Sequence, residues 1–269
     1  GRIGTLSGRS RQPRPCSMTR STSVREAATD VTPADRVAAV RARIAAAARA
    51  AGRDPDAVCL VAIGKTRDAA ELRAVAEAGV TDFGENYLQE ALEKQEALDA
   101  RPGARALTWH FVGALQSNKT RPVAERFDWV HTVDREKIAR RLAGQRPREQ
   151  GPLQVCLQVN LDEEPSKAGL APDAVAPLLA EIAGLEGLRV RGLMAIPAPR
   201  EATAAQQAAF ARLAGLRDRL AQGVPAASLD VLSMGMSGDL EAAIAAGATH
   251  VRIGTALFGP RPEKEPARP

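Results

Sequence analysis

Segments typical of buried β-strands alternate with segments typical of helices along nearly the whole chain, and this alternation limits the possible folds more than any other feature. The strand-like segments are short apolar runs, as in strands that are buried on both faces of a parallel sheet. Strands are predicted at Val58–Ile63, Thr81–Gly84, Thr108–Val112, Trp129–Val133, Leu153–Val159, Val190–Ile196, Leu229–Ser233 and His250–Ile253. Helices are predicted near Ala69–Ala78, Tyr87–Asp99, Asn118–Arg126, Arg135–Leu142, Asp173–Ala183, Ala202–Leu220 and Asp239–Ala246, with a last short turn near Thr255.

Eight strands separated by helices are what a parallel (β/α)8 barrel of the TIM type requires. We therefore predict an α/β protein with a single (β/α)8 barrel and an extra N-terminal helix. That helix is expected over Pro33–Ala50, because Thr32 can cap it and Gly52 lies just past its end. An open doubly wound sheet is the alternative, but it would carry G-x-G-x-x-G after its first strand, and Ile63-Gly64-Lys65-Thr66 does not match that pattern.

Composition divides the chain into one ordered domain and two terminal segments. Residues 1–30 are rich in Arg, Ser, Thr and Pro, so we expect a disordered basic arm there, the barrel over residues 31–260 and a flexible tail over residues 261–269. The arm has six arginines against two acidic residues and so accounts for four of the five net positive charges. It lacks the apolar segment of a secretory signal, and either an organelle transit peptide or an over-extended start would explain its composition.

Several classes of function are excluded by composition. No apolar run approaches the roughly 20 residues of a membrane span, and no basic stripe with interleaved aromatic residues indicates nucleic-acid binding. Cys16, Cys59 and Cys156 have neither the spacing of a disulfide framework nor that of a zinc site. We expect a cytoplasmic protein without membrane or nucleic-acid partners. A lone barrel without a dimerising domain favours a monomer.

Lys65 closes the first predicted strand, and barrel active sites lie at the carboxyl ends of the strands. A lysine at such an edge either stays solvated or supplies the amine of a Schiff base. Glu85 could act as an acid or base, but it also suits a hydrogen-bonding role. His110 and His131 are expected in the core or behind the site.

The loops after the last two strands predict a phosphate site. Strand seven ends in Gly235-Met236-Ser237-Gly238 and strand eight in Gly254-Thr255, each before a helical segment. In barrels these two loops often bind phosphate, because glycine lets the backbone approach the anion and helix N–H groups point at it. Ordinary turn and capping chemistry is the alternative for either loop alone. Arg252 on the last strand needs a partner, either a barrel carboxylate or a ligand atom beside the phosphate.

A lysine on strand one facing a phosphate site on strands seven and eight predicts a phosphorylated aldehyde held as a Schiff base. Pyridoxal 5′-phosphate (PLP) is the obvious ligand of this kind. A barrel enzyme that acts on a sugar phosphate without PLP is the alternative.

Seven ordered motifs, covering roughly residues 33 to 260, resemble the pyridoxal-phosphate homeostasis protein family. The motifs are Ile63-Gly64-Lys65-Thr66, Phe83-Gly84-Glu85-Asn86-Tyr87, Trp109-His110-Phe111-Val112-Gly113, Leu115-Gln116-Ser117-Asn118-Lys119, Arg191-Gly192-Leu193-Met194-Ala195-Ile196, Met234-Gly235-Met236-Ser237 and Arg252-Ile253-Gly254-Thr255-Ala256-Leu257-Phe258-Gly259. The resemblance implies a PLP-binding barrel similar to the N-terminal domain of alanine racemase, with no firmly established catalytic activity.

The resemblance also implies residue roles. Lys65 would form the Schiff base, Asn86 would line the cofactor face and Arg252 would face the pyridine nitrogen. Gly64 departs from the family pattern, in which serine often precedes the lysine; this change should leave the Schiff base intact but loosen the local backbone.

The phosphate would be held, by the same resemblance, by Ser237, Gly254 and Thr255, with backbone help from Met236.

A permanently charged arginine disfavours protonation of the pyridine nitrogen and so weakens carbanion chemistry. Racemases of the related fold have a second base, a tyrosine from another domain, whereas Tyr87 is the only tyrosine here and belongs to a family motif. We therefore expect a PLP carrier and buffer in vitamin B6 homeostasis, without efficient catalytic activity, that supplies apo PLP-dependent enzymes. A PLP-dependent amino-acid racemase is the alternative.

Overall fold

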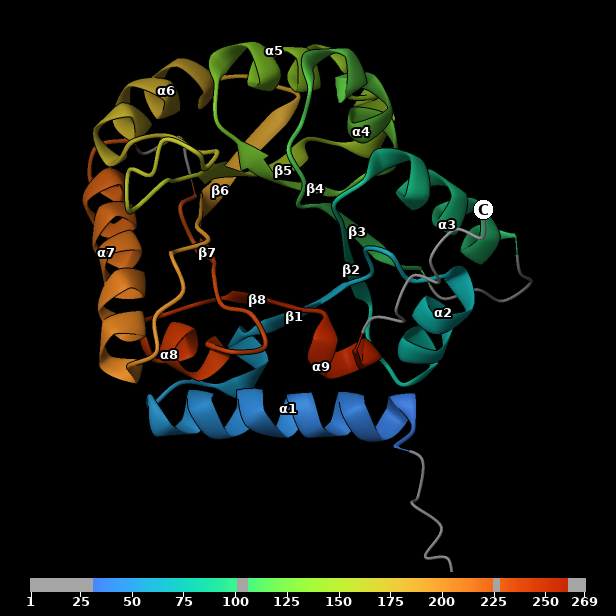
Figure 1. Cartoon of the computed structure of the whole chain (residues 1–269). Helices are drawn as coiled ribbons and strands as arrows, with labels where there is room; N and C mark the ends of the chain where they lie inside the picture. Colours follow the sequence, from blue (N-terminus) through green and yellow to red (C-terminus); the bar gives the residue numbers. More distant parts are fainter. Residues whose placement is uncertain (1–30, 101–105, 225–227, 261–269) are drawn as a thin grey trace, which may run out of the picture. The chain divides into compact units, whose positions relative to one another are not determined.

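The structure, a computed structural model, describes residues 31–100, 106–224 and 228–260. The predicted basic arm at 1–30 and tail at 261–269 lie outside the described residues. Eight parallel strands form a closed barrel in the order β1 to β8, with helices around it (Figure 1). The predicted (β/α)8 barrel is thus confirmed, and the open doubly wound sheet is wrong because β1 pairs with β8 as well as with β2.

The strands and helices follow one another with the predicted alternation. The strands are β1 (Cys59–Ile63), β2 (Asp82–Glu85), β3 (Thr108–Phe111), β4 (Trp129–Val133), β5 (Leu153–Gln158), β6 (Leu188–Met194), β7 (Val231–Ser233) and β8 (His250–Ile253). The helices are α1 (Pro33–Ala50), α2 (Ala69–Glu77), α3 (Leu88–Asp99), α4 (Thr120–Arg126), α5 (Glu136–Gln145), α6 (Val175–Ile182), α7 (Thr203–Ala221), α8 (Leu240–Ala245) and α9 (Thr255–Phe258).

Helix α1 has the predicted bounds, and local chemistry explains its start. The Thr32 side chain accepts a hydrogen bond from the Asp35 N–H, and the Asp35 carboxylate accepts one from the Thr32 N–H, so two free N–H groups of the first turn are satisfied. A stripe of buried residues at helical spacing follows on one face. Through this stripe α1 packs on α8 and α9, as Figure 1 shows. The extra helix therefore lies beside the two last helices of the barrel.

The barrel interior is partly polar. Side chains alternate between the two faces of a strand. On β4 this alternation puts Trp129 and His131 on one face, and both stack or tilt against His110 of β3. Two glycines allow neighbouring groups to approach closely: a Cβ on Gly84 would lie 2.5 Å from Ile63 Cδ1, and one on Gly192 would lie 1.8 Å from the Val231 carbonyl oxygen. The barrel is thus closely packed at these positions, and the histidines place polar groups below the strand ends.

The outer core lies between the strands and the surrounding helices. Its largest fully buried side chains include Phe83, Phe111, Phe127 and Phe210. Burial of this apolar surface is the main stabilising contribution to the fold. In the described part of the chain, none of the helices combines the length and apolar character that crossing a membrane demands.

Candidate functional site

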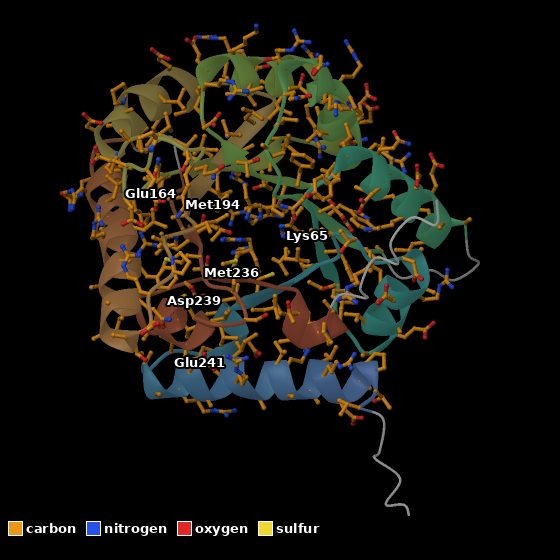
Figure 2. All side chains as sticks on the ribbon, in the orientation of Figure 1. Lys65, Glu164, Met194, Met236, Asp239 and Glu241 are labelled. Atoms are coloured by element: carbon orange, nitrogen blue, oxygen red, sulfur yellow. The ribbon has the colours of Figure 1, made fainter. Side chains whose placement is uncertain are left out.

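A cavity of about 330 Å³ lies at the carboxyl ends of β1, β2, β3, β6, β7 and β8. All seven residues that the sequence predicted for the site line this cavity, namely Lys65, Asn86, Met236, Ser237, Arg252, Gly254 and Thr255. Ile63, Arg67, Val112, Ile196 and Gly238 line it as well. In Figure 2, Lys65 and Met236 lie near the middle of the ring of strands. The fold thus brings the seven predicted residues together from the ends of four strands, up to 190 positions apart in the sequence.

Lys65 lies in a tight turn directly after β1. The Arg67 N–H donates to the Gly64 carbonyl at 3.0 Å and closes the turn. Thr66 has a φ of 64°, in the left-handed region that β-branched residues rarely adopt. The Gly64 N–H donates to the Gly84 carbonyl at 2.9 Å, so the hydrogen bonds of the barrel continue up to the residue before the lysine.

Arg252 is almost completely buried, with 5% of its surface exposed, and it lines the cavity from β8. Its Nη1 donates to the Ser233 hydroxyl at 2.7 Å and its Nη2 donates to the Ala195 carbonyl at 3.1 Å. Burial lowers the pKa of the Arg252 guanidinium to about 10, so the side chain stays charged at neutral pH. The sequence offered a barrel carboxylate as its partner; the partners found within the protein are instead a hydroxyl and a carbonyl oxygen.

A chain of hydrogen bonds runs from Arg252 through the barrel interior. Ser233 Oγ lies 2.7 Å from His131 Nδ1, His131 Nε2 lies 2.9 Å from His110 Nδ1, and His110 Nε2 lies 3.0 Å from Asp82 Oδ1. Burial raises the pKa of Asp82, but hydrogen bonds led by that from His110 outweigh burial and lower it. Because the ionised carboxylate can only accept, His110 Nε2 donates to Asp82 at one end of the chain, and at the other end Arg252 donates to Ser233.

His131 is fully buried in the middle of this chain of hydrogen bonds. Burial lowers the pKa of His131 well below its ordinary value, with help from the neighbouring positive groups. The expectation that His110 and His131 lie behind the site is consistent with these contacts.

Two loops, after β7 and after β8, line the cavity together with Lys65. The Ala256 N–H donates to Ser237 Oγ at 3.4 Å and so links the loops. The Met236 N–H donates to the Asp239 carboxylate at 2.6 Å, which leaves this predicted phosphate donor with a partner inside the protein. Gly235 has a φ of 95°, and a Cβ there would lie 2.6 Å from the Ala243 Cβ, so glycine is required at this turn.

Helix α1 supports the same loops from outside. The Arg43 guanidinium forms a bidentate pair with the Glu241 carboxylate at 2.7 and 2.9 Å, and its Nη2 donates to the Ser237 carbonyl at 3.0 Å. The hydrogen bond from Arg43 lowers the pKa of Glu241. No local pattern in the sequence singles out Arg43, because the residue that it contacts lies 194 positions further on.

Asn86 follows β2 and lines the cavity. Its Oδ1 atom is buried and has no hydrogen-bond partner among the described residues. Gly113 makes this position possible, since a Cβ there would lie 2.0 Å from the Asn86 carbonyl oxygen. An unsatisfied buried polar atom is costly, so the Asn86 amide is suited to bind a ligand.

Two other residues considered in the sequence, Tyr87 and Lys167, do not line the cavity. The Tyr87 side chain is 55% exposed to solvent. Lys167, expected in a solvated loop, forms an ion pair with Glu164 at 2.8 Å.

The described residues contain no group of three His, Cys, Asp or Glu side chains that could hold a metal ion. Cys59 and Cys156 are free thiols, and burial raises the pKa of Cys156 to about 12, so that thiol is unreactive.

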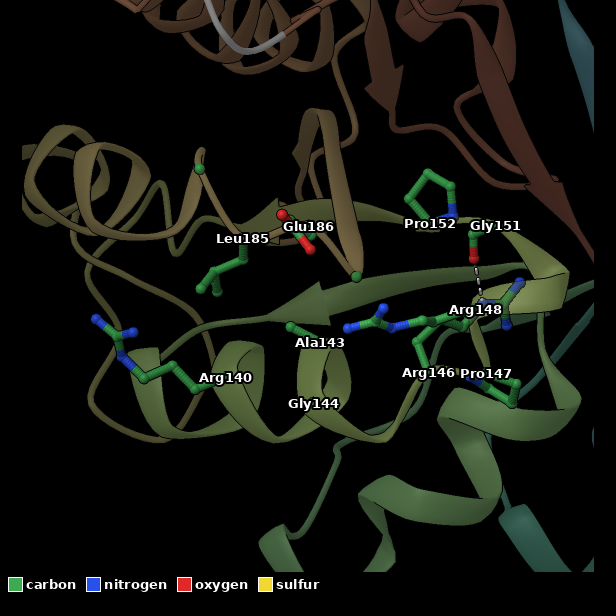
Figure 3. A pocket seen from close by; sticks show the side chains of 12 residues that line it. Arg140, Ala143, Gly144, Arg146, Pro147, Arg148, Gly151, Pro152, Leu185 and Glu186 are labelled. Carbon is green, nitrogen blue, oxygen red and sulfur yellow. Dashed lines mark hydrogen bonds between the residues drawn. The ribbon is translucent and has the colours of Figure 1, made fainter.

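A second cavity, of about 680 Å³, lies at the opposite end of the barrel, between the loops that precede β5 and β6 (Figure 3). None of the seven predicted site residues is among those drawn in Figure 3. Its Arg146 donates to the Ala124, Phe127 and Gly151 carbonyls at 2.7, 2.7 and 2.9 Å. Arg146 therefore ties neighbouring loops together, and its contacts are structural.

Comparison with known proteins agrees with the fold and with the motifs. The sequence model of the alanine racemase N-terminal domain matches residues 36–262. The pyridoxal phosphate homeostasis protein of Pseudomonas aeruginosa is 58% identical over 234 residues, which cover 87% of this chain and 98% of the relative. The protein of the same name from Escherichia coli K12 is 48% identical over 233 residues, covering 85% and 96%.

A solved structure gives the same result. PipY of Synechococcus elongatus, solved with PLP bound, is 39% identical, with a TM-score of 0.74, and the match covers 84% of this chain and 100% of PipY. The chain is thus a (β/α)8 barrel of the alanine racemase N-terminal type with a lysine in its cavity. Within that class it belongs to the pyridoxal phosphate homeostasis protein family.

Proposed function

We propose that this protein holds PLP as a Schiff base on Lys65 and serves PLP (vitamin B6) homeostasis as a carrier and buffer. The observation that carries the proposal is the cavity of about 330 Å³ in which Lys65, Arg252 and two glycine-containing loops meet. Cofactor pockets begin at about 300 Å³. The relatives named above carry the name of this function, and PipY was solved with PLP bound.

The cavity offers a suitable group for each part of the ligand. Lys65 supplies an amine for the aldehyde, and the Asn86 amide has an unsatisfied atom at the cavity wall. Arg252 supplies a buried cation for the acceptor nitrogen of the ring. Ser237 and the N-terminus of the last helix, at Thr255, supply donors for the phosphate.

Lys65 would act through its Nζ as a free amine. This nitrogen forms a C=N bond with the aldehyde carbon of the ligand, and one water molecule leaves. Hydrolysis of the same bond returns the amine and the aldehyde, so the attachment is reversible. PLP supplies, when bound, an electron-withdrawing ring, but a carrier needs only reversible capture. A Kd of about 1 μM, which allows release, corresponds to about 8 kcal/mol of binding free energy.

Two features favour a carrier over an amino-acid racemase. The Arg252 guanidinium is held as a donor by Ser233 and Ala195, and a cation beside the ring nitrogen disfavours its protonation. Moreover, the only tyrosine of the chain, Tyr87, is largely exposed, so it is poorly placed as a second base. We therefore assign no catalytic residue.

The recipients in this proposal are apo forms of PLP-dependent enzymes, and the protein acts as a monomer in the cytoplasm. The free thiols of Cys59 and Cys156 support a reducing compartment.

The first experiment is the visible absorption spectrum of the purified protein with added PLP, followed by borohydride reduction and peptide mapping. Wild type should show a band that borohydride bleaches, with the pyridoxyl mass on Lys65. Lys65→Ala should show neither. Lys119→Ala is the matched control, because Lys119 is an exposed lysine at the same end of the barrel, and it should behave as wild type.

The outcomes separate the candidate functions. A colourless wild type, or label scattered over surface lysines, would reject the PLP site and favour a sugar-phosphate enzyme. If the loaded protein restores activity to an apo-enzyme, the carrier role is supported; exchange of amino-acid α-protons into deuterated solvent would instead favour the racemase.

A further inference from the structure

Helix α3 holds the backbone on both sides of Lys65. The Lys94 ammonium donates to the Gly64 carbonyl at 2.7 Å, directly before the lysine. The Glu90 carboxylate accepts from the Thr66 N–H at 3.1 Å, directly after it. Lys94 and Glu90 lie one helical turn apart, so one face of α3 reaches both peptide groups.

The two α3 side chains belong to an ionic cluster that is buried at Lys94 and Glu85 and partly exposed at Glu90. Lys94 Nζ lies 2.9 Å from Glu85 Oε1 and 3.6 Å from Glu90 Oε2. Lys94 has 6% of its surface exposed and Glu85 has none. Removing two charges from water costs free energy that their mutual attraction does not fully offset unless further hydrogen bonds compensate. A cluster of this kind, directly behind the lysine of a ligand cavity, is therefore better explained by a positioning role than by stability.

The turn that the cluster holds is strained. Thr66 adopts a φ of 64°, although its branched side chain disfavours this region. Strained residues persist where surrounding contacts over-determine their conformation, and they concentrate at functional sites. The hydrogen bond from Thr66 to Glu90, together with that from Arg67 to Gly64, provides such contacts.

Gly64 leaves the room that the cluster needs. A Cβ at this position would lie 2.5 Å from Glu85 Oε1 and 3.0 Å from Leu72 Cδ1. A side chain at 64 would thus push the Glu85 carboxylate away from Lys94.

We propose that Lys94 and Glu90, supported by Glu85, are positioning residues that aim the Lys65 amine at the aldehyde of the ligand. This inference rests on the proposed function, since it concerns the same lysine. Helix α3 would set the orientation of the attacking Lys65 nitrogen, whereas the phosphate loops and Arg252 would determine how tightly the ligand binds. A misplacement of about 1 Å in a reacting group can cost about 100-fold in rate.

The test separates bond formation from binding. The rate constant for formation of the borohydride-trappable Schiff base on Lys65 is measured with PLP by stopped flow. The Kd is measured in parallel with pyridoxine 5′-phosphate, which carries the same ring and phosphate but has no aldehyde. A structural role would change both quantities together, whereas a positioning role changes the rate constant alone.

The variants are Glu90→Ala and the double variant Lys94→Met with Glu85→Met, which removes the buried pair without leaving one charge unpaired. Each should lower the rate constant for the bond to Lys65 by about tenfold or more, with the Kd for pyridoxine 5′-phosphate unchanged within about twofold. Glu93→Ala is the matched control, because Glu93 is an exposed carboxylate of α3 that pairs with Gln89. Lys94→Arg, which keeps a positive charge at this position, should have a rate constant for bond formation between that of the double variant and that of wild type.

Wild-type rate constants in folded Glu90→Ala and in the double variant would overturn the inference, as would a parallel loss of pyridoxine 5′-phosphate binding. A wild-type protein that binds no PLP would reject the proposed function itself, so the two failures are distinguishable. If the double variant does not fold, Glu90→Ala alone decides, because Glu90 is partly exposed and its removal leaves the Lys94–Glu85 pair intact.

Discussion

Arg252 donates through Nη1 to the Ser233 hydroxyl at 2.7 Å, and this hydroxyl lies 2.7 Å from His131 Nδ1. The serine hydroxyl therefore accepts from a charged donor and also lies within hydrogen-bond distance of the histidine. Bonds with an ionised partner are among the stronger hydrogen bonds in proteins. The guanidinium is thus fixed at the cavity wall by a chain of side chains that ends, through His110, at Asp82.

Ser233→Ala should destabilise the protein by about 1–3 kcal/mol, because Arg252 Nη1 and His131 Nδ1 would both be buried without a partner. The measurement is the free energy of unfolding in urea. Ser228→Ala serves as the control, since Ser228 is exposed, and it should cost less than about 0.5 kcal/mol. If the two variants destabilise the protein equally, the hydrogen bonds from Arg252 through Ser233 to His131 do not contribute to stability.

Gly235→Ala should destabilise the protein and weaken PLP binding. The residue has a φ of 95° and its new Cβ would lie 2.6 Å from that of Ala243. Overpacking costs about 1–3 kcal/mol, and the left-handed backbone adds about 1–2 kcal/mol. Gly238→Ala, three residues further on in the same loop, has no atom within 4 Å of the new Cβ and should keep the wild-type melting temperature; a matching loss there would contradict the steric explanation.

Arg43→Ala should weaken PLP binding while changing stability little. The Arg43–Glu241 pair is partly exposed, and such pairs contribute about 0–1 kcal/mol. Arg43 also holds the Ser237 carbonyl, so its loss should loosen the proposed phosphate loop and raise the Kd for PLP about threefold or more, or at least about 0.6 kcal/mol. The control is Arg49→Ala, an exposed arginine of the same helix; if both variants bind PLP equally well, α1 does not support the loop.

Glu85→Gln should change how stability depends on pH. Burial raises the pKa of Glu85 from 4.5 to about 7, against the lowering effect of Lys94. Between these values the folded protein binds a proton that the unfolded chain has released. The contribution of Glu85 to stability is therefore present below pH 4.5, falls as pH rises towards 7, and stays lost above it.

The measurement is the difference in unfolding free energy between wild type and Glu85→Gln from pH 5 to pH 8. As the pH rises to about 7, wild type should lose stability relative to Glu85→Gln, by at most about 1.4 kcal/mol per pH unit. Above about pH 7 the difference should stay constant. Glu93→Gln should give a curve parallel to that of wild type. If the difference in unfolding free energy between wild type and Glu85→Gln does not change with pH, the Glu85 carboxyl of the wild type titrates normally.

The barrel was predictable because local patterns specify it. Helix α1 has the predicted bounds, since Thr32 and Pro33 mark its start by capping chemistry. The strand ends differ slightly: β7 begins at Val231 rather than Leu229, because pairing with neighbouring strands, and not the apolar run alone, decides where a strand begins. That the seven predicted residues meet around one cavity follows from the rule that barrels place their sites at strand ends; their roles towards PLP stay a prediction.

The supporting contacts were not predictable from the sequence. Ser233 as the partner of Arg252, and Lys94 behind Lys65, depend on which side chains the closed barrel brings together. Lys94 lies in an amphipathic helix, where a lysine normally faces solvent. The only signal that could have singled it out is its spacing of four residues from Glu90, and that spacing is common on exposed helices.

The contact between Arg43 and Ser237 joins the first helix of the barrel to its last loops, 194 residues later. Helix α1 also packs on α8 and α9, the helices that follow the two loops proposed to hold the phosphate. These loops therefore take their final form only when segments from far apart in the sequence have come together. Ligand capture by the loops would thus report that the barrel has closed around α1.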